Sequence, residues 1–103
     1  MKVELTQQFK KWFDKLKDID AKTAIAFRVE SMRSHEKILG DWKPVGDDVI
    51  EFRLHIGPGY RLYAAKEGAV LLLLLLGGSK ASQKRDIKHA KRILKDWRKH
   101  HAR

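Results

Sequence analysis

Apolar and polar residues alternate along residues 49–56, a pattern that predicts a strand with one buried face and one polar face. The residues expected to face the core are Ile50, Phe52, Leu54 and Ile56, and those expected on the other face are Glu51, Arg53 and His55. Gly57-Pro58-Gly59 predicts a tight turn, because glycine tolerates positive φ and proline fixes its own φ. The chain would return along 60–65, turn again at 66–68 and enter 69–76, an apolar run typical of a strand buried on both faces.

A helical spacing of apolar residues marks three further segments. The first helix begins after Thr6, a candidate N-cap, and carries the apolar stripe Phe9, Trp12, Phe13 and Leu16. The second begins at a cap formed by Asp18 or Asp20 and would make an antiparallel hairpin with the first. The last helix carries Ile87, Ala90, Ile93, Leu94 and Trp97 on one side, and the charged tail after Trp97 is expected to fray.

Two short segments complete the predicted order of elements. Residues 2–5 fit either an edge strand or the lead-in to a helix, and residues 42–45 fit a short strand. The order of two helices, four strands and one helix predicts an α+β fold, in which helices pack on one face of an antiparallel sheet of about four strands. The chain has 103 residues, so we expect a single domain spanning 1–103 with one core.

Composition excludes several classes of protein. The sequence contains no cysteine, which excludes disulfides and cysteine-ligated zinc. The N-terminal residues lack the apolar core and cleavage site of a secretory signal. The longest apolar run is far shorter than the roughly 20 residues that span a bilayer. We therefore expect a cytoplasmic protein with no membrane association.

The positive charge is concentrated near the C-terminus. The formal net charge is +10, and residues 79–103 hold six lysines and four arginines against two aspartates, a local charge of +8. A basic surface attracts polyanions. The charge therefore indicates a nucleic acid or an acidic protein as partner, although a solvated helix face would have the same composition.

A cationic cluster follows from the predicted strand pairing. If the alternating apolar residues of 49–56 face the helices, Arg53 and His55 emerge on the opposite, open face. The turn at 57–59 would place Arg61 and Tyr63 beside them, provided that the leucine between these two residues faces the core. Lys80 follows the adjoining buried strand after two glycines. Such a cluster, with few carboxylates near it, is suited to binding phosphates.

Other catalytic or metal-binding patterns are weak or missing. The sequence has no Gly-x-x-x-x-Gly-Lys loop, no His-Glu-x-x-His and no Gly-x-Ser-x-Gly. The segment 77–80 lacks the first glycine of a nucleoside-triphosphate loop. His100 and His101 are adjacent residues near a terminus, which is a poor arrangement for metal ligation. We expect neither a metal nor another cofactor.

Three segments carry a family resemblance: the helix motif Phe-x-x-Trp-Phe-x-x-Leu, residues 40–65 and residues 71–90. Together they resemble the RelE/ParE superfamily of toxins from type II toxin-antitoxin systems, and within it the HigB-like "addiction module killer protein" branch. The most specific matches are Gly57-Pro58-Gly59-Tyr60-Arg61 and the segment GGSKASQ at 77–83. Ser79 stands where this branch often has aspartate. The resemblance implies a RelE-like fold with an N-terminal helical hairpin and a C-terminal helix.

The resemblance also implies an activity and residues for it. Such toxins are metal-independent endoribonucleases, or mRNA interferases, that cut translated mRNA at the ribosome and inhibit growth. The matching catalytic positions are Arg61 for the transition-state charge, Lys80 for the scissile phosphate or a proton, and Arg53 for the RNA backbone. The residues expected to bind RNA are Lys43, His55, Tyr63, Lys84, Arg85 and Lys88. The general acid and base stay unassigned, because no tyrosine follows Tyr63; His55 is a candidate.

The implied partners are a cognate antitoxin, mRNA and the ribosome, with a toxin-antitoxin hetero-oligomer as the assembly. Two alternatives have different targets. A ParE-like inhibitor of DNA gyrase would share the fold without needing the cationic cluster. A non-catalytic module would bind nucleic acid through the last helix, so Lys88, Arg92 and Lys95 would matter more than Arg61.

Overall fold

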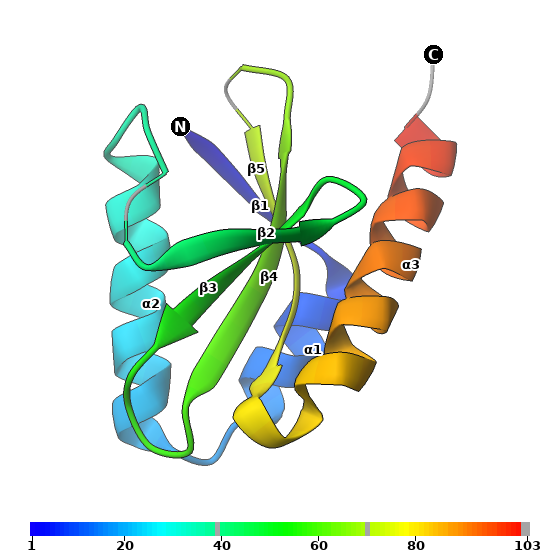
Figure 1. Ribbon diagram of the computed structural model, residues 1–103. Coiled ribbons are helices and arrows are strands. Elements are labelled where there is room, and N and C mark those ends of the chain that lie inside the picture. The colour runs from blue at the N-terminus through cyan, green and yellow to red at the C-terminus, as the bar shows by residue number, and fades with distance from the viewer. Residues whose placement is uncertain (39, 70, 102–103) are drawn as a thin grey trace.

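The computed structural model describes residues 1–38, 40–69 and 71–101. Its elements in chain order are β1 (Lys2–Leu5), α1 (Gln7–Lys15), α2 (Ile19–Arg33), β2 (Trp42–Gly46), β3 (Val49–Leu54), β4 (Tyr60–Glu67), β5 (Leu71–Ser79), the 3₁₀ turn η1 (Lys80–Ser82) and α3 (Gln83–His101). The strands form one sheet in the order β1-β5-β4-β3-β2 (Figure 1). The predicted α+β class is confirmed, with five strands instead of about four.

The additional strand is β1, and it makes the sheet mixed. β1 pairs in parallel with β5, whereas the pairs β5–β4, β4–β3 and β3–β2 are antiparallel. Thr6 fastens the end of β1, because its hydroxyl donates to the carbonyl of Leu75 over 2.8 Å. The same hydroxyl oxygen accepts from the backbone N–H of Phe9 over 3.1 Å. Thr6 is therefore the predicted N-cap of α1 and also a link to the sheet.

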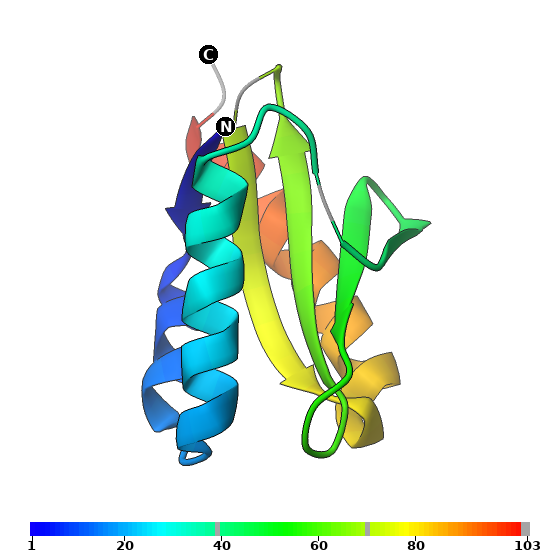
Figure 2. The ribbon, with the colours of Figure 1, turned by 90° about the vertical axis from the view of Figure 1, so that its left-hand side faces the viewer.

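The helices cover both faces of the sheet, so the prediction that they all pack on one face is wrong. α1 and α2 lie on one side and α3 lies on the other (Figures 1 and 2). Phe9, Ile25 and Phe52 belong to the core under α1 and α2, whereas Tyr63, Leu75 and Leu94 belong to the core under α3. The physical reason is that β4 and β5 are apolar on both faces, and each face requires its own cover.

Two glycines let helices from opposite layers approach the end of β5. A Cβ atom added at Gly77 would collide with the ring of Trp12 on α1, and one added at Gly78 would collide with the carboxylate of Asp86 on α3. Both positions are therefore closed to larger residues. Trp12 and Asp86 thus pack against the two faces of β5 near its end. The chain then leaves β5 and enters η1, which begins at Lys80.

The start of α2 agrees with the predicted cap, whereas the end of α3 differs from the prediction. The carboxylate of Asp18 accepts from the backbone N–H of Ala21 over 3.0 Å, so Asp18 rather than Asp20 caps α2. α3 continues to His101 instead of fraying after Trp97, and the rings of these two residues stack with centroids 4.0 Å apart. Position 39 in the segment after α2, position 70 in the predicted apolar strand and positions 102–103 of the tail lie outside the described residues.

Candidate active site

Four of the predicted site residues line one pocket at the end of the sheet where β3 turns into β4. Arg53, His55, Arg61 and Lys80 line this pocket together with residues 54 and 56–59, and its volume is about 450 Å³. Arg53 belongs to β3, His55 follows its end, Arg61 belongs to β4 and Lys80 to η1. We call this space the basic pocket.

Strand pairing and two glycines hold the walls of the basic pocket. Arg53 and Arg61 are direct partners across the β3–β4 pair, so their side chains leave the same face of the sheet. Gly57 and Gly59 adopt φ angles of 52° and 80°, which glycine accepts without strain. The backbone N–H of Lys80 donates to the carbonyl of Gly59 over 2.9 Å. This bond ties η1 to the turn and holds the lysine at the pocket.

Arg61 lies at the base of the basic pocket and is 9% exposed. Its Nε lies 4.0 Å from Oε1 of Glu51, whose side chain is fully buried. The side-chain amide of Gln83 donates to Oε2 of the same carboxylate over 2.8 Å. Neither Arg61 Nε nor Glu51 Oε1 has a hydrogen-bond partner among the described residues. The two opposite charges therefore compensate each other through space rather than through a hydrogen bond between these atoms.

The prediction that Tyr63 emerges beside the arginines on an open face is wrong. Tyr63 is fully buried and belongs to the core that α3 covers. Burial raises the pKa of its hydroxyl, and the nearby charge of Glu51 raises this pKa further. Because α3 covers this part of the sheet, Tyr63 supports the floor of the site and does not reach the surface.

An acidic side chain borders the basic pocket, so the expected shortage of carboxylates is also wrong. Oδ2 of Asp41 lies 2.8 Å from Nε2 of His55, and Oδ1 lies 3.4 Å from Nη2 of Arg53. The hydrogen bond from His55 lowers the pKa of Asp41, and the charge of Arg53 acts in the same direction. Asp41 therefore orients two side chains at the rim of the pocket.

Comparison with known proteins gives a family and a fold. No protein-family model matches the chain. It is 36% identical over 96 residues to an uncharacterized protein of Haemophilus influenzae (strain ATCC 51907 / DSM 11121 / KW20 / Rd), and the alignment covers 93% of this chain and 95% of that protein. The chain belongs to the family of this H. influenzae protein.

Two solved structures share the fold of this chain. A chain of the intact E. coli RelBE toxin-antitoxin complex superposes with a TM-score of 0.59 at 15% identity, covering 76% of this chain and 94% of that chain. A mutant of E. coli toxin RelE in the free state superposes with a TM-score of 0.56 at 21% identity, covering 89% and 96%. The predicted RelE-like fold is confirmed, whereas the HigB-like branch stays a prediction.

The other exposed residues of this chain that the sequence predicts to bind RNA lie outside the basic pocket. Lys84 and Arg85 line a neighbouring hollow of about 760 Å³ that also includes Lys80. Lys88 is exposed one turn further along α3. Lys43 is exposed on the edge strand β2, directly opposite Glu51. The structure therefore joins Lys84 and Arg85 to the basic pocket through Lys80 and leaves Lys43 and Lys88 apart.

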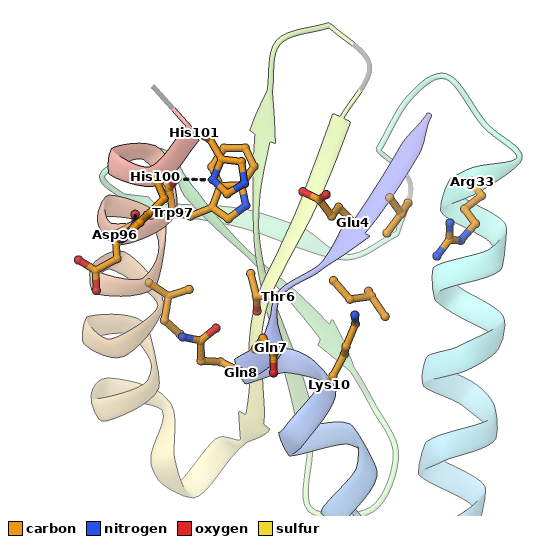
Figure 3. A pocket seen from close by; sticks show the side chains of 13 residues that line it. Glu4, Thr6, Gln7, Gln8, Lys10, Arg33, Asp96, Trp97, His100 and His101 are labelled. Atoms are coloured by element: carbon orange, nitrogen blue, oxygen red, sulfur yellow. Dashed lines mark hydrogen bonds between the residues drawn. The ribbon is translucent and has the colours of Figure 1, made fainter. Parts of the chain in front are cut away.

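A hollow of about 750 Å³, larger than the basic pocket, lies along β1, between the start of α1 and the end of α3. Figure 3 shows Glu4 on β1 in the middle, Arg33 at one side, and Trp97 and His101 stacked at the other. It contains none of the predicted catalytic residues, and its lining mixes both signs of charge.

No helix in the described part of the chain is long and apolar enough to cross a membrane.

Sequence reasoning missed three residues that shape the site: Asp41, Glu51 and Gln83. Glu51 lies two residues before Arg53, and residues with this spacing share a face of a strand. This spacing is the sequence signal that could have placed Glu51 near the arginines. The bond from Gln83 to Glu51 joins residues 32 positions apart, and the bond from His55 to Asp41 joins residues 14 apart. Such contacts depend on the folded topology and leave no local pattern in the sequence.

Proposed function

We propose that this protein is the toxin of a type II toxin-antitoxin module and acts as an mRNA endoribonuclease in the cytoplasm, on translated mRNA at the ribosome and without a metal ion. The observation that carries this proposal is the convergence of Arg53, Arg61 and Lys80 on one pocket of a RelE-like fold. Three cations around a pocket of this size suit one phosphodiester group with its flanking riboses.

The reaction that fits the basic pocket is attack of a ribose 2′-oxygen on the adjacent phosphorus, with cleavage of the bond to the 5′-oxygen. The 2′-hydroxyl loses a proton and the leaving 5′-oxygen gains one. Arg61 would stabilise the charge that develops on the phosphorane-like transition state, since its guanidinium lies in the pocket, 4.0 Å from the buried carboxylate of Glu51. Lys80 would hold the scissile phosphate, and Arg53 the next one along the strand.

His55 is the group in the pocket best placed to transfer a proton. Its Nε2 bonds to Asp41, which leaves Nδ1 for exchange with the substrate or with water. A carboxylate behind an imidazole fixes the orientation of the ring, as in other acid-base sites. His55 is exposed at the rim, so it can exchange its proton with solvent between turnovers.

The proposed protein partner is an antitoxin. The E. coli chain with the same fold was solved in a toxin-antitoxin complex. The net charge of +10 on this chain favours a partner with acidic side chains. A hetero-oligomer of the two proteins is the assembly we expect.

The test is induced expression in a bacterial host, with growth curves and primer extension on an abundant transcript. Lys80→Ala and Arg61→Ala should each lower cleavage about 100- to 1,000-fold, the usual effect of losing one preorganised charge donor. Lys80 is exposed, so its replacement leaves the core intact. Arg33→Ala, at the far end of α2, removes an exposed arginine outside the basic pocket and should behave as wild type.

Two outcomes would contradict the proposed nuclease activity. If both variants still arrest growth while transcripts stay whole, a gyrase-type binding target replaces mRNA. If charge reversal at Lys88, Arg92 and Lys95 abolishes activity while Lys80→Ala does not, the protein binds nucleic acid through α3 without cutting it.

A further inference from the structure

A second hollow adjoins the basic pocket on the side of α2. It has a volume of about 620 Å³, and its lining includes Ala24, Phe27, Leu54 and Ile56. These residues come from α2, from the end of β3 and from the turn that follows it. We call this space the α2 groove.

The two hollows share a wall. Residues 53–56 line both the basic pocket and the α2 groove. A ligand that crosses Arg53 and His55 therefore passes from a cationic surface to an apolar one within a single strand end. The continuity indicates one extended ligand with a charged part and an apolar part.

Phe27 gives the α2 groove an aromatic surface. Its side chain is 76% exposed, and its ring stacks on no other ring among the described residues. Ile19, on the same helix, is also 76% exposed but does not line the groove. The apolar contacts that Phe27 lacks in the folded chain are available to a flat ligand.

The polar groups at the edge of the α2 groove include both hydrogen-bond donors and acceptors. Arg53 supplies N–H groups, and Asp20 and Asp41 supply carboxylate oxygens. Nucleobases carry a flat apolar face and an edge with donors and acceptors, and single-stranded RNA is commonly bound by stacking a base on an aromatic side chain. An anionic backbone beside Arg53 then matches the charge of the basic pocket.

From this geometry we infer that the α2 groove binds one unpaired RNA base next to the phosphate held in the basic pocket, with Phe27 as the stacking surface. The inference rests on the proposed function, because it takes the basic pocket as the phosphate site. It adds a residue that determines which bases flank the cut. The polar edge of the groove would discriminate between bases through its hydrogen bonds.

The test uses purified full-length protein and a short fluorescent single-stranded RNA whose 2′-O-methyl groups prevent attack. Phe27→Ala should weaken binding about 5- to 150-fold, the range typical for loss of one base-aromatic stack. Phe27→Trp should retain binding. Ile19→Ala is the matched control, since it removes an equally exposed apolar side chain from the same helix and should bind as wild type.

A second probe series locates the stacked base. Replacing single nucleotides with abasic ones should weaken binding to wild type at one position, and Phe27→Ala should show no further loss at that position. Equal affinities for wild type and Phe27→Ala, or no binding of the probe by wild type, would overturn the inference. Loss of antitoxin binding by Phe27→Ala with unchanged RNA binding would assign the groove to the protein partner instead. Binding of this probe by wild type, together with intact transcripts in the induced-expression assay, would refute the proposed nuclease activity and leave the base site standing.

Discussion

Replacing Glu51 by leucine should destabilise the fold strongly, because it leaves Arg61 charged and nearly buried without a counterion. The carboxylate is 4.0 Å from Arg61 Nε, and the two side chains are 0% and 11% exposed. At this separation a unit charge pair is worth about 4 kcal/mol with an effective dielectric constant of 20. Removing one partner of such a buried pair typically costs about 3–5 kcal/mol. Gln83 also loses the acceptor of its side-chain amide.

The measurement is urea unfolding followed by circular dichroism, comparing midpoints at equal slopes. A loss of about 3–5 kcal/mol is a large part of the 5–15 kcal/mol typical of a small domain. The double variant Glu51→Leu with Arg61→Leu should recover much of the loss, because it removes both charges. Glu36→Leu, at an exposed position, is the control and should change stability by less than about 0.5 kcal/mol.

The reasoning would be refuted by either of two results. A loss below about 1 kcal/mol in Glu51→Leu would mean that Arg61 is solvated in the folded protein and needs no counterion. A double variant less stable than the single one would mean that the side chains matter for packing rather than for charge.

Two further predictions concern the ends of the strands. Gly77→Ala should destabilise the protein by about 1–3 kcal/mol through overpacking against Trp12, and urea unfolding should show recovery when Trp12→Leu makes room. The pKa of Asp41 is lowered from 3.8 in the folded state by its bond with His55, so this interaction stabilises the fold above pH 4 and is lost as the pH falls further. Asp41→Asn should therefore flatten the decline of the melting temperature below pH 4; an unchanged decline would place the acid sensitivity elsewhere.

The period-two pattern of residues 49–56 was enough to predict part of the lining of the basic pocket. It placed Arg53 and His55 on one face, and the turn at 57–59 brought Arg61 opposite Arg53, as the register confirms. These are local relations between adjacent strands. They depend only on the alternation of apolar and polar residues and on a short turn, and both can be recognised from consecutive residues of the sequence.

The layers of helices depended on information that is not local. The apolar run 69–76 predicted a strand buried on both faces, and such a strand needs cover on both sides, which one layer of helices cannot give. β1 has four residues, too few to show a period, and its parallel pairing with β5 joins distant parts of the chain. Tyr63 was placed on the surface because an amphipathic residue fits either face, and only the position of α3 decides between them.

The link between Thr6 and Leu75 spans 69 residues, and this span affects when the protein can fold. Contacts between distant positions close large loops and slow folding. During synthesis β1 leaves the ribosome before the other described elements, and it has no partner until β5 follows. Lys80 comes later still. The basic pocket therefore assembles only after Lys80 has been translated, so a nascent chain that stops before this residue lacks the complete pocket.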